Sequence, residues 1–192
     1  MAKRRRLQPQ QSKALILEAT ARVITEEGSA ALSVRRVAKE AGIYPSLVHY
    51  YFETTEALLL AFFREQAARH VRLIEEALAA KRPLKALWDV QTRAPSGLMT
   101  LEIMSLGHRY ESLRRELGAH LQVVRKALAH ALADALARRG DAALGNSPEA
   151  AAFMLLAAAG ALVADRGIGL TAGHAKVSQL TLAWIGELEQ AE

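Results

Sequence analysis

The sequence predicts an all-α protein of about nine helices, with a three-helix N-terminal domain at 1–54 and a helical bundle at 55–192. Two observations support this class. Apolar residues recur in steps of three and four along several stretches, which is the spacing of one helix face. Hydrophobic residues make up 51% of the 192 residues and charged residues 23%, a balance that favours a packed core over disorder.

The first predicted helix spans 11–27 and ends at Gly28. Its expected buried face consists of Ile16, Ala19, Thr20, Val23 and Ile24. A second helix at 34–41 begins after Ser33, whose hydroxyl can accept a hydrogen bond from a free amide of the first turn. We expect Gly42 to allow a sharp reversal of the chain, with Ile43 packed in the corner between the helices.

The third predicted helix, at 45–52, has one packed side and one open side. Pro45 suits its first turn, where the missing N–H is not needed. At about 100° per residue, Val48, Tyr51 and Phe52 fall on the packed side. The open side carries Pro45, Ser46, His49 and Tyr50, and the outer face of the preceding helix carries Arg35, Arg36 and Lys39.

Two short helices joined in this way have the shape that enters the DNA major groove. Residues 1–55 hold nine Lys or Arg against five Glu, so +4 of the total charge of +5 lies there. Basic side chains beside phosphates give strong, salt-dependent DNA binding. The basic segment at 3–6 is open to two interpretations: an arm that reaches the DNA backbone or minor groove, or a solvated tail.

Residues 16–62 resemble the N-terminal DNA-binding domain of the TetR family of bacterial transcriptional regulators. The resemblance depends on two blocks, SVRRVAKEAGI at 33–43 and LVHYYFETTEAL at 47–58, and covers about a quarter of the chain. It implies a homodimeric repressor that binds a palindromic double-stranded DNA operator through the helix at 45–52. It also implies release from DNA by a small-molecule effector of unknown identity.

Arg35 is the first candidate for a base contact, because its guanidinium can form two hydrogen bonds to a guanine edge. Family members often place a phosphate-binding lysine where this chain has Thr55, so we expect that contact only through the Thr55 hydroxyl and nearby amides. Tyr44 and Pro45 also depart from the commoner small polar and basic residues. The predicted DNA contacts are Ser33, Arg35, Arg36, Tyr44, Pro45, Ser46, Leu47, His49, Tyr50, Tyr51, Thr54 and Thr55.

Helices are also predicted throughout the rest of the chain. Thr54 caps a helix that continues to about residue 80, and its apolar start, 58–63, is expected to be buried and to connect the DNA-binding domain with the bundle. Shorter helices are predicted at 84–91 and 98–108. A long helix at 112–139 is expected to pack antiparallel to the helix at 54–80.

The last two helices are predicted to form the dimer interface. Ser147, Pro148 and Glu149 mark the start of a helix that continues to about residue 165. The final helix carries Val177, Leu180, Trp184 and Leu188. Neither has a wide polar face, which favours four helices packed across a two-fold axis. The alternative is burial of both helices inside one chain.

An effector pocket is expected among the helices at 54–139. The candidate lining residues are Phe63, Trp88, Met99, Glu102, Ile103, Met104 and His108. Aromatic and methionine side chains at helical spacing are also typical of an ordinary core, and this alternative stays open.

Other classes of function lack support in the sequence. There is no cysteine, and the six histidines form no HExxH motif. No glycine-rich phosphate loop or nucleophile set is present, so we predict no cofactor, no metal and no enzymatic activity.

The N-terminus lacks the apolar segment of a secretion signal, and the apolar run at 150–164 is short for a membrane span. We therefore expect a cytoplasmic protein. The competing hypothesis is a helix-turn-helix module that answers to a protein partner or has no small-molecule effector.

Overall fold

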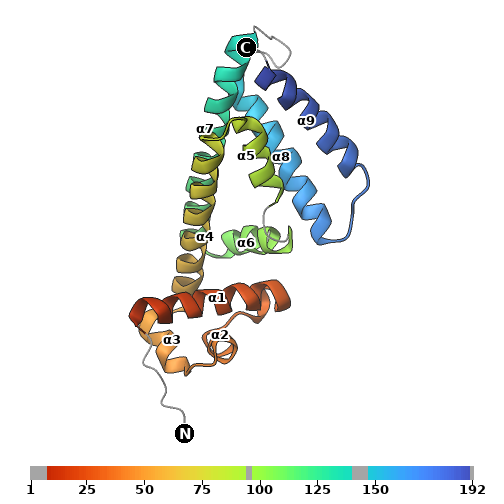
Figure 1. Cartoon of the computed structure of the whole chain (residues 1–192). Helices are drawn as coiled ribbons and strands as arrows, with labels where there is room; N and C mark the ends of the chain where they lie inside the picture. The colour runs from red at the N-terminus through yellow and green to blue at the C-terminus, as the bar shows by residue number, and fades with distance from the viewer. Residues whose placement is uncertain (1–7, 94–96, 140–146, 191–192) are drawn as a thin grey trace. The chain divides into compact units, whose positions relative to one another are not determined.

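The protein is described by a computed structural model, which covers residues 8–93, 97–139 and 147–190 (Figure 1). These residues form helices and contain no strand, so the predicted all-α class is confirmed. The helices are α1 (Pro9–Glu27), α2 (Val34–Ala41), α3 (Pro45–Tyr51), α4 (Thr55–Leu78), α5 (Pro83–Thr92), α6 (Gly97–Arg109), α7 (Glu111–Arg139), α8 (Pro148–Gly167) and α9 (His174–Gln190). A 3-10 turn, η1 (Ser29–Ala31), was not predicted, because three residues carry no periodicity.

The chain divides into two compact units. One consists of the described residues of Met1–Gln66 together with Glu102–Arg114, and the other of Ala67–Leu101 and the described residues of Arg115–Glu192. We call them the head and the body. The predicted domain boundary after residue 54 stays a prediction. The compact units divide the chain elsewhere because α4, α6 and α7 each continue from one unit into the other.

The core of the head joins α1, α2, α3 and the start of α4. Its buried members are Ile16, Ala19, Val23, Val34, Val37, Ala38, Val48, Phe52 and Leu58. The predicted buried face of α1 is confirmed, including Thr20, whose hydroxyl donates a 2.9 Å hydrogen bond to the Ile16 carbonyl. This packing fixes α3 and leaves its opposite side exposed.

The turn between α2 and α3 depends on Gly42. Its φ angle of 65° lies in the left-handed region, and its N–H donates to the carbonyls of Ala38 and Lys39. The N–H of Ile43 also donates to the Ala38 carbonyl, at 3.0 Å. These bonds satisfy carbonyls at the end of α2 and set the direction in which α3 begins.

We expect Gly42→Ala to destabilise the protein by about 1–2 kcal/mol, because an L side chain is strained in this backbone conformation. Steric clash is not the cause, since a Cβ at Gly42 would meet nothing within 4 Å. Gly118 in α7 is the matched control: its Cβ would also meet nothing within 4 Å, and no positive φ constrains it. Gly118→Ala is expected to stabilise by about 0.5–1 kcal/mol. Urea unfolding of both variants checks the opposite signs.

The predicted antiparallel packing of α4 and α7 is wrong. Within the head, Ser112 at the start of α7 donates a 2.6 Å hydrogen bond to Glu56 at the start of α4. Within the body, His70 of α4 lies beside His120 of α7. The contacts occur in the same order along both helices, so the helices are parallel. Leucine spacing predicts which face of a helix is buried but contains no information about its direction.

The core of the body is built by residues of α4, α5, α7, α8 and α9. Its fully buried members include Leu84 and Leu87 of α5, Leu132 of α7, and Ile185 and Leu188 of α9. The Arg82 guanidinium forms a 2.9 Å ion pair with Glu189, whose other oxygen accepts from the Lys85 amide at 3.1 Å. The start of α5 is thereby tied to the end of α9.

Two half-buried histidines meet within the body. Nδ1 of His70 lies 3.0 Å from Nε2 of His120, and Nε2 of His70 lies 3.3 Å from Nε2 of Gln91. Burial, with a smaller contribution from His120, lowers the pKa of His70 from 6.5 to about 4. Burial also lowers the pKa of His120. Both rings are therefore neutral at pH 7.

The depressed pKa of His70 predicts a pH-dependent stability. The unfolded chain takes up a proton near pH 6.5 that the folded chain resists until about pH 4, so stability is complete above pH 6.5 and falls as pH is lowered towards 4. One such proton corresponds to about 1.4 kcal/mol per pH unit. Urea unfolding between these pH values should show a weaker pH dependence in His70→Gln. The exposed His130 is the control, and an equal change in His130→Gln would contradict the assignment.

Helix α8 is buried on one face only. Ala151, Ala152, Leu155, Ala159 and Leu162 lie in the core, whereas Phe153 and Met154 are 54% and 57% exposed. At 20 residues, α8 is long and apolar enough to cross a membrane by length and composition, which corrects the expectation that its apolar run is too short. Core helices of soluble proteins meet the same criterion, so this property alone is weak support for a membrane span.

Candidate nucleic-acid interface

The open side of α3 is an exposed polar and aromatic surface of the head. Tyr44 is 68% exposed and Tyr50 is 80% exposed, and Pro45, Ser46 and His49 are exposed beside them. Val48, on the opposite side of the helix, is fully buried. The structure therefore brings five of the predicted DNA contacts together on one face.

Leu47 and Tyr51 are only half-buried and lie at the edge of this face. The Tyr51 ring meets the Tyr50 ring edge-on, with centroids 5.1 Å apart. The ammonium group of Lys13, on α1, lies 5.9 Å from the centre of the Tyr51 ring. Sequence reasoning missed Lys13 because its closeness to α3 arises from packing between helices far apart in the chain. The only local signal is that Lys13 itself is an exposed cation on α1.

Arg35 and Arg36 have different surroundings. The Arg35 side chain is exposed and, within the described part of the chain, has no hydrogen bond or ion pair. The Arg36 guanidinium donates to Glu27 at the end of α1 and to Glu40, the latter at 2.9 Å. Arg22 also donates to Glu40, at 2.8 Å. A phosphate contact by Arg36 would therefore compete with two carboxylates, whereas Arg35 is free to bind.

This cluster of charges joins α1 to α2. Hydrogen bonds from Arg36 lower the pKa of Glu27, and hydrogen bonds first from Arg22 and then from Arg36 lower the pKa of Glu40. Hydrogen bonds to Glu27 and then to Glu40 raise the pKa of Arg36. All three groups are ionised at pH 7, and the cluster holds the end of α1 against α2.

Three of the predicted contacts, Ser33, Thr54 and Thr55, lie at helix starts. The Ser33 hydroxyl accepts a 3.1 Å hydrogen bond from the Arg36 amide, and the Thr54 hydroxyl accepts a 3.0 Å bond from the Ala57 amide. Each oxygen keeps its own O–H as a donor for a phosphate. Thr55 is half-buried, and Glu56 beside it is held by Ser112. The start of α4 thus offers hydroxyls and amides but no cation.

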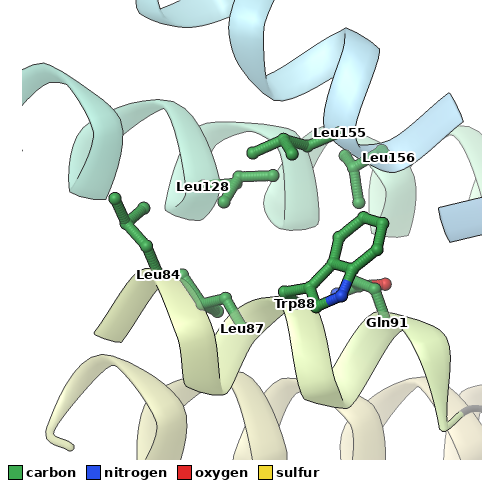
Figure 2. A pocket seen from close by; sticks show the side chains of 7 residues that line it. All are labelled: Leu84, Leu87, Trp88, Gln91, Leu128, Leu155 and Leu156. Carbon is green, nitrogen blue, oxygen red and sulfur yellow. The ribbon is translucent and has the colours of Figure 1, made fainter. Parts of the chain in front are cut away.

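Among the predicted effector-binding residues, Trp88 lines a cavity in the body. Figure 2 shows its indole ring extending from α5 towards the leucines of α8. The lining residues are Leu84, Leu87, Trp88, Gln91, Leu128, Leu155 and Leu156. The volume of this cavity is about 10 Å³, which leaves room for about one water molecule.

The other predicted effector residues do not line this cavity. Phe63 is buried in the head, Ile103 is half-buried, and Met104 and His108 are exposed. The Met99 side chain falls outside the described part of the chain. Glu102 has a different role, because its carboxylate accepts a 3.0 Å hydrogen bond from the Ser29 amide of η1. An acid 73 residues away in sequence therefore caps the turn that follows α1.

Comparison with known proteins identifies relatives of this architecture. The family model described as "Bacterial regulatory proteins, tetR family" matches residues 16–62. The HTH-type transcriptional regulator BetI of Rhizobium meliloti is 31% identical over 131 residues, which are 64% of this chain and 64% of that protein. The match therefore spans less than two thirds of that relative's length.

Two solved structures share the fold over nearly the whole chain. A putative transcriptional regulator from Pseudomonas aeruginosa PAO1 has a TM-score of 0.77 and 26% identity, with 96% of this chain and 93% of that chain covered. A TetR transcription regulator from Haloarcula marismortui has a TM-score of 0.76 and 24% identity, with 92% and 97% covered. Regulators of this kind are not enzymes. Residues 16–62 therefore match the DNA-binding domain of the TetR family of bacterial regulatory proteins, and the chain is similar to transcriptional regulators over most of its length.

Proposed function

We propose that this protein is a repressor that binds a palindromic operator as a homodimer and is released by a small-molecule effector. The observation that carries the proposal is the exposed face of α3, where Tyr44, Ser46, His49 and Tyr50 surround a helix fixed by the head core. These four side chains offer hydrogen-bond donors and acceptors to base edges and phosphates. Arg35 adds a guanidinium that is unpaired among the described residues. A regulator of DNA acts where the chromosome lies, which implies the cytoplasm.

Exposed apolar side chains on α8 and α9 support dimerisation through these two helices. Phe153 and Met154 of α8 are 54% and 57% exposed, and Val177 and Leu180 of α9 are 39% and 59% exposed. The inner faces of both helices are already packed in the body core. Apolar exposure on both helices favours a self-complementary interface over burial within one chain.

The effector part of the proposal requires the body to change shape if the ligand binds beside Trp88. Small-molecule pockets have volumes of about 300–1,000 Å³. The Trp88 cavity of about 10 Å³ is far smaller. An effector there would bind a conformation in which α5 and α8 have moved apart. It would release DNA only if that conformation presents the two heads less favourably to the operator.

The small cavity also favours a second candidate, a helix-turn-helix module that has no small-molecule effector or answers to a protein partner. Selection from random double-stranded DNA at two salt concentrations tests DNA recognition in both candidates. A single enriched palindrome supports the operator-binding regulator. Weak binding to all sequences, lost as salt rises, contradicts sequence-specific recognition.

A further inference from the structure

A groove in the body is lined by cationic and hydroxyl-bearing side chains. It lies where α5 ends, α8 ends and α9 begins (Figure 1). Its lining residues are Thr92, Arg93, Leu162, Arg166, Thr171, His174, Ala175 and Ser178. None of these described residues is Asp or Glu. The volume of the groove is about 340 Å³, which is typical of a small-molecule site. We call it the α5–α8–α9 groove.

Arg166 is held in place by neutral partners. Its Nε donates to the Leu162 carbonyl at 2.9 Å, and its Nη2 donates to the Thr92 carbonyl at 2.8 Å. Among the described residues, no carboxylate pairs with this guanidinium. The two carbonyl oxygens carry no net charge, so they do not neutralise the guanidinium. The N–H groups of Nη1 also remain available as donors. A fixed guanidinium of this kind loses little side-chain entropy when it binds an anion.

Arg93 adds a second positive charge at the rim. Its side chain is 78% exposed, and its Nη2 lies 3.4 Å from an oxygen of Asp89. The same Asp89 oxygen accepts a 2.7 Å hydrogen bond from Lys85. One carboxylate is therefore shared by two cations, and one positive charge remains available at the groove.

The other walls supply polar side chains and a small apolar surface. Thr171 and Ser178 belong to the lining, and Nε2 of His174 lies 3.4 Å from a carboxylate oxygen of Asp165. Leu162 and Ala175 provide the apolar part. A carboxylate or phosphate group beside the arginines, with a short apolar body against Leu162, matches this distribution.

The groove lies on a different side of the helices from the proposed dimer surface. On α9, Ser178 faces the groove together with Ala175, whereas Val177 and Leu180 are exposed. On α8, Leu162 is buried at the groove, whereas Phe153 and Met154 are exposed. A ligand in the groove and a second subunit on the outer faces can therefore be bound together.

We propose that the α5–α8–α9 groove binds a small organic acid or a phosphate-bearing small molecule, whose anionic group is held by Arg166 and Arg93. This site differs from the cavity beside Trp88, and its ability to bind an anion does not depend on DNA recognition.

Isothermal titration of the full-length protein without DNA, in Tris chloride buffer, tests the site. Acetate, octanoate and inorganic phosphate are the probes, and tetramethylammonium is the cationic control. We expect the anions to bind, and Arg93→Gln to weaken binding about tenfold through the loss of one charge-assisted contact. Arg72→Gln, which changes an exposed arginine of α4 outside the groove lining, should bind like the unchanged protein.

The outcomes separate the sources of the anion. Tighter binding of octanoate than of acetate identifies an organic acid, and tightest binding of phosphate identifies a phosphate-bearing ligand. No anion binding at millimolar concentration, or equal weakening by Arg93→Gln and Arg72→Gln, overturns the proposal. Arg93 is exposed, so its loss leaves the fold intact even if Arg166→Gln, which cuts the link between α5 and α8, does not fold. Because the titration contains no DNA, failure of the repressor proposal would leave its result unchanged.

Discussion

Arg35→Ala is expected to reduce strongly the preference for the operator over other DNA while leaving the oligomeric state unchanged. The Arg35 side chain is exposed on α2 and, within the described residues, unpaired. A guanidinium that binds a guanine edge with two hydrogen bonds contributes about 1–3 kcal/mol of discrimination against the wrong base, which is roughly 5–150-fold in relative affinity. Fluorescence anisotropy with the selected operator and a scrambled duplex measures this ratio.

Lys39→Ala is the matched control, because Lys39 is another exposed cation on the same short helix. A lysine that contacts only phosphate adds affinity for every sequence equally. Its loss should weaken binding to both duplexes and lower the slope of log affinity against log salt by about 1, without changing their ratio. An unchanged ratio in Arg35→Ala would assign Arg35 to the backbone and leave base recognition to α3.

Replacing Phe153 and Leu180 together by Asp is expected to convert the proposed dimer into monomers. Each subunit would bring two charges into a surface that the proposed interface removes from water, and an unpaired buried charge is costly. A monomer contacts one half-site, so operator affinity should fall by about 100-fold to 10,000-fold through the loss of bivalent binding. Sedimentation equilibrium and operator titration measure the two effects.

Leu73→Asp serves as the control for this variant. Leu73 is an exposed leucine of the body, 49% accessible, and it lies on α4 rather than on α8 or α9. It should leave both the dimer and the operator affinity unchanged. A double variant that remains dimeric, with normal helix content by circular dichroism, would place the interface on another surface.

Local sequence signals predicted the helices well because each signal acts within one or two turns. Ser33, Gly42, Pro45 and Ser147 define helix ends through caps and backbone preferences that need no distant partner, and all four lie at the predicted ends. The open face of α3 followed from the same periodicity. These features require only neighbouring residues.

Long-range relations were not predictable in the same way. The parallel direction of α4 and α7 depends on where α5 and α6 lead the chain. The Arg36 ion pairs bring together residues of α1 and α2. Glu102, a predicted effector residue, instead accepts a hydrogen bond from the Ser29 amide, which lies 73 residues earlier. Every residue except proline has a backbone amide, so the sequence does not indicate which amide a distant carboxylate binds. The two arginines of the α5–α8–α9 groove are similarly far apart, at positions 93 and 166.

The head is assembled from two separate stretches of the chain. Glu102 caps η1, Ser112 holds Glu56, and Leu106 and Leu113 are buried in the same unit. A fragment that stops at residue 66 would lose these partners and uncover apolar surface that they protect from water. Transplanting this DNA-reading module onto another sensor would therefore require residues 102–114, or a replacement for them, to travel with it.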